Sequence, residues 1–432
     1  MNPASRSAIR ALGFSAALLA ATGCDDLRAQ TGLAGRVAAA PDGDVRFSFA
    51  PRPGVCGDGT TFFAIDGGTY IGTVTSIETA RGSCAPGPVR VVVDRAGGQV
   101  IGVRTFVGPV SQPAEAVTDF GEIPPRDAAD YLLGIAATAD GRPARDAITP
   151  AALAQGVDVG DRLIAIARDA NRPLDTRRAA MSWLGRGAST PDAARRASAA
   201  LLDLVRSGSQ PHAVRRHALT TLARLDGGAG VPAVIALAGS RDDAWMTREA
   251  VAALARSGDP RARESLREVV RRGTLPDEPT SVAIRGLAGE YATAQDAALL
   301  RDRFVQLQGE RSRRAVVTAM TERGGAENAR WLLQVAARSD EGEAVRRSAL
   351  SGARRAGASS AEIARLYDQG DNVMRSLVVS ALASEPDDAA VAKLLDIARS
   401  GDDRTIRRRA VSALGRIDDP KVKAALGEIV VR

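Results

Sequence analysis

The chain has 432 residues, of which 45% are hydrophobic, 25% are charged and only 3% are aromatic, and it contains two histidines and three cysteines. These proportions are typical of a folded protein and exclude a disordered chain, a membrane-embedded bundle and a small disulfide-rich scaffold. His212 and His217 are too few for a multi-histidine metal centre, which argues against enzymes that depend on several imidazoles.

The net charge of +7 does not indicate nucleic-acid binding. Lysine occurs at only three positions, and a GC-rich coding sequence is enough to produce such an excess of arginine. Residues 1–23 carry +2, residues 24–126 carry −2 and residues 127–432 carry +7, with basic and acidic residues interleaved. Because this excess of positive charge is spread over about 300 residues and mixed with acidic residues, it does not form a polybasic stripe. We therefore predict no nucleic-acid partner.

The first 29 residues have the pattern of a bacterial export signal. Arg6 and Arg10 precede an apolar run of about 12 residues, 11–22, which is too short to span a bilayer that needs roughly 20. Residues 21–24, Ala-Thr-Gly-Cys, resemble a lipobox, in which the cysteine becomes the lipidated N-terminus. Ordinary cleavage after Ala29 is the alternative, so we expect either a membrane-anchored lipoprotein attached through Cys24 or a soluble periplasmic protein.

Export also determines how the remaining cysteines are interpreted. Cys56 and Cys84 form an even pair in an oxidising compartment, which predicts a disulfide. A reactive thiol is the weaker alternative, because neither cysteine belongs to a CxxC motif or has a neighbouring histidine.

Residues 44–110 are predicted to form a small antiparallel β domain. The segment 45–49 alternates apolar and polar residues, residues 69–77 are rich in β-branched side chains, and residues 89–93 and 100–104 flank a glycine turn at 95–98. The proline-bearing residues 111–126 that follow are predicted to be a linker.

From residue 127 onward, small and aliphatic residues recur at helical spacing with a period near 33. One small residue marks each copy, and the eight positions are Ala180, Ala218, Ala250, Ala283, Ala315, Ala349, Val378 and Ala410. A Leu or Ala stands four residues after each marker, on the same helix face. Asp-Pro pairs such as Asp259-Pro260 end one helix and begin the next, so each copy is predicted to be a helical hairpin.

Arginine recurs two residues before the marker in six copies. We call this set the arginine ladder, and it comprises Arg178, Arg216, Arg248, Arg313, Arg347 and Arg408. Acidic residues stand a few positions earlier in most copies, at Asp175, Asp242, Asp243, Glu310, Glu341, Glu343, Asp402 and Asp403. We favour a stabilising role, in which each arginine pairs with an inter-helix turn, over a stripe that binds an acidic partner.

Residues 407–420, RRRAVSALGRIDDP, resemble the short HEAT repeat of phycobilin lyases, and residues 247–260 and 345–353 are similar. The resemblance covers residues 127–432, about nine helical pairs. It implies a mostly α-helical chain: an α-α superhelix, or HEAT/armadillo-like solenoid, preceded by the disulfide-linked β domain. It also implies a protein-binding surface, since such repeats serve mostly in protein interactions.

We therefore expect an exported, non-enzymatic scaffold that binds a protein partner in the bacterial envelope, with no cofactor, no metal and no catalytic residues. One alternative is a β module that binds a ligand or glycan, with the solenoid as a spacer. A HEAT-type lyase or hydroxylase is the weakest alternative, because di-iron hydroxylases need repeated His-Glu pairs and this chain has no His-Glu dipeptide. The oligomeric state is left open.

Overall fold

In the computed structural model, the described residues are 32–60, 63–65, 69–71, 84–109, 117–187, 190–240, 243–384, 386–400 and 403–430. The predicted signal segment and Cys24 lie outside them. The chain divides into two compact units, Met1–Ala229 and Gly230–Arg432, and each is described separately. Their boundary falls within the predicted solenoid and not at the predicted linker.

A four-stranded sheet lies in the first unit, after the short helix α2 (Leu33–Ala39). Its strands, in spatial order, are β6 (Gln99–Val107), β5 (Val89–Ala96), β1 (Gly43–Phe49) and β7 (Thr118–Glu122). Val45, Phe47 and Phe49 of β1 are fully buried, as the alternation predicted. The predicted hairpin turn is present between β5 and β6, where Gly97 and Gly98 have φ of 59° and 74°, which favour glycine.

A second, three-stranded sheet consists of β2 (Val55–Gly57), β3 (Phe63–Ile65) and β4 (Thr69–Ile71), all antiparallel. The predicted disulfide is present: Cys56 in β2 is bonded to Cys84, with Cα atoms 5.2 Å apart. Beside it, the Gly57 amide donates to the Ala85 carbonyl at 3.0 Å. Of the predicted strand 69–77, the first three residues form β4 and the rest lie outside the described residues.

The predicted linker 111–126 is corrected by the structure. Thr118–Glu122 form strand β7, which pairs with β1 in parallel, and α4 (Pro125–Thr138) begins three residues later. Tyr131 of α4 then packs edge-on against Phe47, with ring centroids 6.1 Å apart. The β module and the first helices therefore share one core, so the β domain does not end at residue 110.

The rest of the first unit is helical. Its elements are α5 (Gly141–Asp146), α6 (Ile148–Ala152), α7 (Gly160–Arg168), α8 (Leu174–Gly187), α9 (Pro191–Arg206), α10 (His212–Leu222) and the 3-10 turn η1 (Asp226–Gly228). Two hydrogen bonds join the chain after β1 to the end of α6: the Arg52 amide donates to the Leu153 carbonyl at 2.7 Å, and the Gln155 amide to the Ala50 carbonyl at 3.1 Å.

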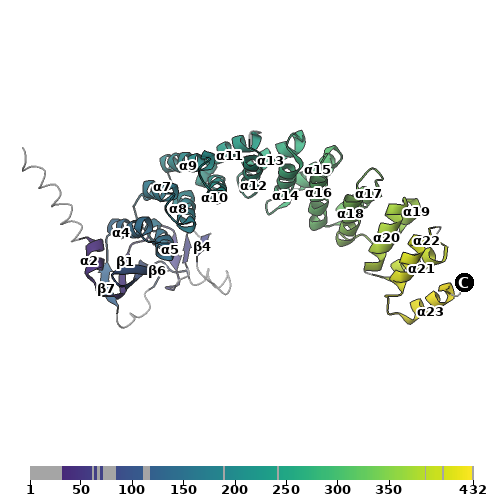
Figure 1. Cartoon of the computed structure of the whole chain (residues 1–432), viewed down its shortest axis with the longest axis horizontal. Coiled ribbons are helices and arrows are strands. Elements are labelled where there is room, and N and C mark those ends of the chain that lie inside the picture. Colours follow the sequence, from purple (N-terminus) through teal and green to yellow (C-terminus); the bar gives the residue numbers. More distant parts are fainter. Residues whose placement is uncertain are drawn as a thin grey trace, which may run out of the picture. The chain divides into compact units, whose positions relative to one another are not determined.

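The second unit begins with α11 (Val231–Gly239) and continues as helical hairpins (Figure 1). The first helices of the hairpins are α12 (Ala244–Ala255), α14 (Asp277–Ala288), α16 (Glu310–Arg323), α18 (Glu343–Arg355), α20 (Asn372–Ser384) and α22 (Arg404–Leu414). The second helices are α13 (Pro260–Arg272), α15 (Ala294–Arg303), α17 (Ala326–Ala337), α19 (Ser360–Gln369), α21 (Asp388–Ser400) and α23 (Pro420–Val430), and the 3-10 turn η2 (Phe304–Gln306) follows α15. Figure 1 shows α13, α15, α17 and α19 along one edge, above α12, α14, α16 and α18.

The repeat markers form the packing surface of the first helices. Ala250, Ala283, Ala349, Val378 and Ala410 are 0% exposed. The predicted helix boundary at Asp259-Pro260 is also present, since the Asp259 carboxylate accepts from the Arg261 amide at 2.7 Å and Pro260 opens α13. The predicted fold class, a helical solenoid preceded by a small disulfide-linked sheet, is thus confirmed.

Candidate functional site

The arginine ladder lies largely at the surface. Arg178 faces Asp175 of its own helix at 3.5 Å, and Arg347 pairs with Glu343 one turn before it. Arg248 pairs with the adjacent Glu249 at 2.6 Å and approaches Glu278 of the next hairpin at 3.8 Å. Arg216 and Arg408 are exposed on α10 and α22.

Arg313 differs from these members of the ladder because it forms a short ion pair with a buried carboxylate of the next hairpin. Its Nε donates to the Leu307 carbonyl at 2.7 Å, and its Nη1 lies 2.9 Å from both carboxylate oxygens of Glu341. Glu341 is only 6% exposed and precedes α18, so this ion pair joins α16 to the following turn. It is the arrangement that the sequence predicted for the ladder as a whole.

A second set of arginines, one residue earlier in the repeat, binds the end of the preceding helix. We call it the inner arginine row, and its members are Arg177, Arg215, Arg346 and Arg375. Arg177, Arg215 and Arg346 each donate Nε–H to the carbonyl ten residues earlier, at Ala167, Val205 and Ala336, over 2.9 to 3.1 Å. Arg375 donates to the Tyr367 carbonyl at 3.3 Å.

These carbonyls belong to the last turns of α7, α9, α17 and α19, where helical carbonyls have no partner within the helix. Thr247 and Thr280 occupy the same repeat position and donate their hydroxyls to the carbonyls of Ser240 and Leu275. Ser240 is the C-cap residue of α11, and Leu275 lies in the connection after α13, so these two hydroxyls bind the end of the preceding helix or the turn that follows it.

Two members of the inner row also bind forward along the chain. Both Nη atoms of Arg346 donate to Asp371, at 2.8 and 3.0 Å, and an Nη atom of Arg177 donates to the Gln210 side chain at 2.5 Å. The hydrogen bond from Arg346, and then the Met374 amide, lower the pKa of Asp371. Each of these arginines therefore bridges the helix before it and the turn after it.

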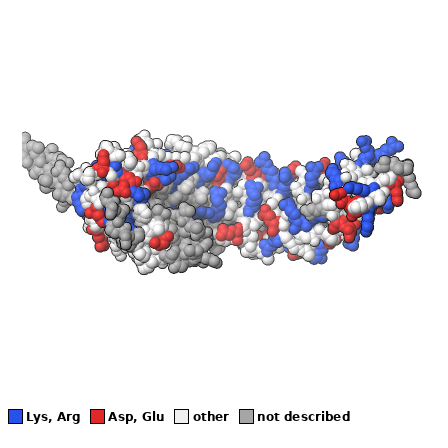
Figure 2. Space-filling model, turned by 90° about the horizontal axis from the view of Figure 1, so that it is seen from below, with Lys and Arg blue, Asp and Glu red and all other residues white. Residues whose placement is uncertain are grey.

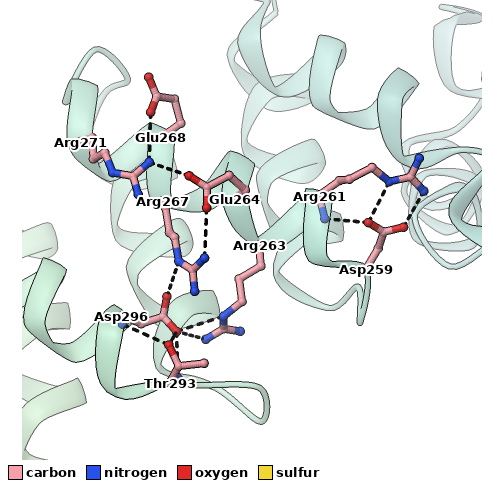
Figure 3. A network of polar contacts seen from close by, with 9 residues as sticks. All are labelled: Asp259, Arg261, Arg263, Glu264, Arg267, Glu268, Arg271, Thr293 and Asp296. Carbon is pink, nitrogen blue, oxygen red and sulfur yellow. Dashed lines mark hydrogen bonds and ion pairs between the residues drawn. The ribbon is translucent and has the colours of Figure 1, made fainter.

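A network of charged and polar side chains joins α13 to α15 (Figure 3). Asp296, 1% exposed, accepts from Arg263 at 2.6 Å, from Arg267 at 2.8 Å and from the Thr293 amide at 2.8 Å. Burial alone would raise the pKa of Asp296, but the hydrogen bonds from Arg267, Thr293 and Arg263 outweigh it and lower the pKa to about 2. Asp296 is therefore ionised in the folded protein and fixes the two second helices against each other.

The histidine and tryptophan residues considered in the sequence analysis take part in hydrogen bonds or packing within the fold. His217 Nε2 lies 3.1 Å from the Arg178 carbonyl oxygen and 3.0 Å from Ser182 Oγ, and burial lowers its pKa. Trp331 packs edge-on against Phe304 at 5.2 Å, and Trp183 is 3% exposed. In the described residues, no group of three or more His, Cys, Asp or Glu side chains is arranged to hold a metal ion.

Sequence analysis missed the inner row although its period is visible in the sequence. At about 100° per residue, a position three before the marker lies about 60° from it around the helix, whereas the ladder position lies about 160° away. The inner row therefore faces the core side and the ladder faces outward. The Arg-Arg pairs at 177–178, 215–216 and 346–347 carry this signal.

Residues 198–288 and 360–432 match the family model of HEAT repeats, so these segments consist of HEAT repeats. The search of curated proteins gives no significant match. Among the described helices, none is both long and apolar enough to cross a membrane.

Several solved structures are similar to this chain at low identity. Human deoxyhypusine hydroxylase is 20% identical over 54% of this chain and 90% of its own, with a TM-score of 0.26. The CpcE and CpcF complex of phycocyanin lyase from Nostoc sp. PCC7120 is 20% identical over 55% of this chain and 93% of the matched chain, with a TM-score of 0.28. Lipovitellin is 13% identical over 78% of this chain and 40% of its own, with a TM-score of 0.39.

Proposed function

We propose that this HEAT-repeat protein is an exported, non-enzymatic scaffold that binds an acidic protein partner in the bacterial cell envelope through the exposed face of its first helices. The different environments of the two arginine sets support this proposal. The inner row is occupied in capping helices, whereas most of the ladder points outward. Figure 2, which views the array from the side of the first helices, shows many Lys and Arg side chains on the second unit, with fewer acids between them.

The observation that carries the proposal is the charge on α22. Arg404 and Arg408 are exposed there, one helical turn apart, and within the described residues neither forms an ion pair. Asp403, the nearest described acid in sequence, accepts from the amides of Thr405 and Ile406 as the helix cap. The neighbouring first helix α20 exposes Val373 and Ser380 and contains no acidic residue. A surface rich in arginine and poor in acids favours a partner that supplies carboxylates.

The test is a crosslinking pull-down from envelope extract with the full mature chain. The matched variants are Arg404→Glu with Arg408→Glu, and Arg330→Glu, which changes an exposed arginine on the second helix α17. We expect a partner enriched by the wild type and by Arg330→Glu, and lost with the double variant. Enrichment of no protein would contradict the scaffold, and retention of the partner by the double variant would contradict the proposed surface.

Two further measurements address the rest of the proposal. If Cys24 is the lipidated N-terminus, the Cys24→Ser variant should no longer fractionate with membranes. A mature N-terminus at Gln30 would instead support the soluble periplasmic alternative. Metal analysis of the purified protein should find no stoichiometric iron or zinc, and a full equivalent of either would overturn the non-enzymatic assignment.

A further inference from the structure

A cavity of 150 Å³ lies in the second unit between α14, α15 and α16. The exposed residues Thr293, Glu322 and Arg323 mark its opening to solvent. Its wall includes five buried apolar side chains, each at most 6% exposed, and these are Leu287, Ala297, Leu300, Ala319 and Met320. Apolar cavities of about 150 Å³ stay dry and bind guests such as benzene, so a guest of that size fits this space.

The repeat sequence explains why this space exists. The position four residues after the repeat marker is leucine in six of the eight copies, but it is alanine in α16, at Ala319. Leu287 occupies the same position of α14 and lies in the wall of the same cavity. A buried alanine where the repeat otherwise has leucine leaves an unfilled volume, because the surrounding helices collapse onto it only in part.

Polar groups of the wall already have hydrogen-bond partners. The Thr293 hydroxyl donates to the Asp296 carboxylate at 2.5 Å and accepts from the Asp296 amide at 3.2 Å (Figure 3). The Leu287 carbonyl accepts from an Nη atom of Arg263 at 2.9 Å. Because these groups are bonded within the protein, an apolar guest takes no hydrogen bond away from them.

The charges around the cavity favour neither an anion nor a cation. The charged residues at and beside the lining come in sets of opposite sign, and these are Glu322 and Arg323 at the opening, Arg285 and Glu290 near the end of α14, Arg301 with Glu327, and Asp296 and Glu264 with Arg263 and Arg267. A charged guest would find no net opposite charge here, and it would lose its hydration on entering. A neutral guest avoids this cost.

We infer that this cavity binds one neutral ring of benzene size, which packs against Met320, Leu287 and Leu300. Methionine suits this contact because its polarizable thioether packs favourably against aromatic rings. A free aromatic molecule and the phenylalanine side chain of a polypeptide offer the same ring. No residue of the lining belongs to the arginine ladder or to α22, so the inference is independent of the proposed scaffold function.

The test follows the methyl resonance of Met320 in the full chain, labelled with carbon-13 at the methionine methyl groups. The chain has five methionines, and Met320→Leu identifies the resonance. The probes are toluene, benzoate and benzylammonium, which are similar in size and are neutral, anionic and cationic. We expect toluene to shift the Met320 resonance with a Kd of about 1 mM or lower, at least about ten-fold below the Kd of either ion. Acetyl-phenylalanine amide separates the two sources: tighter binding than toluene assigns the site to a polypeptide side chain, and weaker binding assigns it to a free molecule.

Three variants complete the test. Ala319→Leu restores the leucine of the other repeats and fills the cavity, so it should abolish toluene binding. Ala288→Leu, at a half-buried position of the lining, should do the same, whereas Ala298→Leu adds the same side chain at an exposed position of α15 and should change nothing. No shift of the Met320 resonance near the solubility limit of toluene, an equal Kd for toluene and either ion, or unchanged binding by a folded Ala319→Leu or Ala288→Leu would each overturn the inference. The comparison of the three probes and Ala288→Leu still decide the matter if Ala319→Leu does not fold.

Discussion

Arg346 and Asp371 form a two-pronged ion pair that joins α18 to the start of α20, at 2.8 and 3.0 Å. The same guanidinium donates backward to the Ala336 carbonyl at the end of α17. One side chain, 3% exposed, therefore connects three helices of the array.

We predict that Arg346→Ala lowers the free energy of unfolding by about 2 to 3 kcal/mol, because it leaves a helix-end carbonyl and a carboxylate without their partner. The neighbouring Arg347 is the matched control. Its side chain is 66% exposed and pairs with Glu343 within the helix, so Arg347→Ala should cost no more than about 0.5 kcal/mol. Urea unfolding of both variants measures the difference, and equal losses would contradict the distinction between inner row and ladder.

The sequence indicated the hairpins well because their signals are local. The marker and the residue four positions later share a helix face, and Asp259-Pro260 carries its own cap. The same holds for β1, where alternation alone placed Phe47 and Phe49 inside. Local patterns therefore sufficed for most of the helical array, for strand β1 and for the β5–β6 hairpin at one edge of the sheet.

The features that the sequence did not indicate depend on partners distant in the chain. Strand β7 contains a single large apolar residue, Phe120, so it has no alternating pattern. It is a strand because it pairs with β1, more than 70 residues earlier in the chain. Asp296 resembles a simple helix-start residue, with Thr293 before it, until the fold brings Arg263 alongside it. Long-range pairing of this kind has no periodic signature in the sequence.

Asp296 makes stability depend on pH. Its pKa is lowered from 3.8 to about 2 in the folded state, so its contribution is fully present above about pH 4 and is lost as the pH falls through 2. A shift of this size corresponds to about 2 kcal/mol. We predict that Asp296→Asn destabilises the second unit at pH 7 and that the difference from wild type narrows as the pH falls toward 2. The free energy of unfolding of the wild type and of Asp296→Asn, measured from pH 7 to pH 2, checks this. A difference between the two proteins that does not change with pH would refute the prediction.

The disulfide should stabilise the first unit. Cys56 and Cys84 are 28 residues apart, and closing a loop of this size stabilises the folded state by roughly 3 to 4 kcal/mol on the chain-entropy account. We predict that Cys56→Ser with Cys84→Ser lowers the melting temperature of the first unit and that adding reductant to the wild type has the same effect. The double variant should not respond to reductant, and a wild type whose melting is unaffected by full reduction would show that the bond contributes little.

Gly286 tests how closely the hairpins pack. A Cβ atom at this position of α14 would lie 2.5 Å from the Ala255 Cβ, 3.0 Å from the Ala255 Cα and 3.1 Å from a methyl group of Leu266. Helix α12 must therefore move to accept any side chain, and we predict that Gly286→Ala costs about 1 to 3 kcal/mol despite the better helix propensity of alanine. Gly134, also within a helix, has no neighbouring atom within 4 Å of the position that a Cβ would occupy, so Gly134→Ala should instead stabilise by about 0.4 to 1 kcal/mol. Denaturant unfolding measures the change in the free energy of unfolding for each variant. We expect Gly286→Ala to lower it and Gly134→Ala to raise it. Stabilisation by both substitutions would show that α12 and α14 can move apart at little cost.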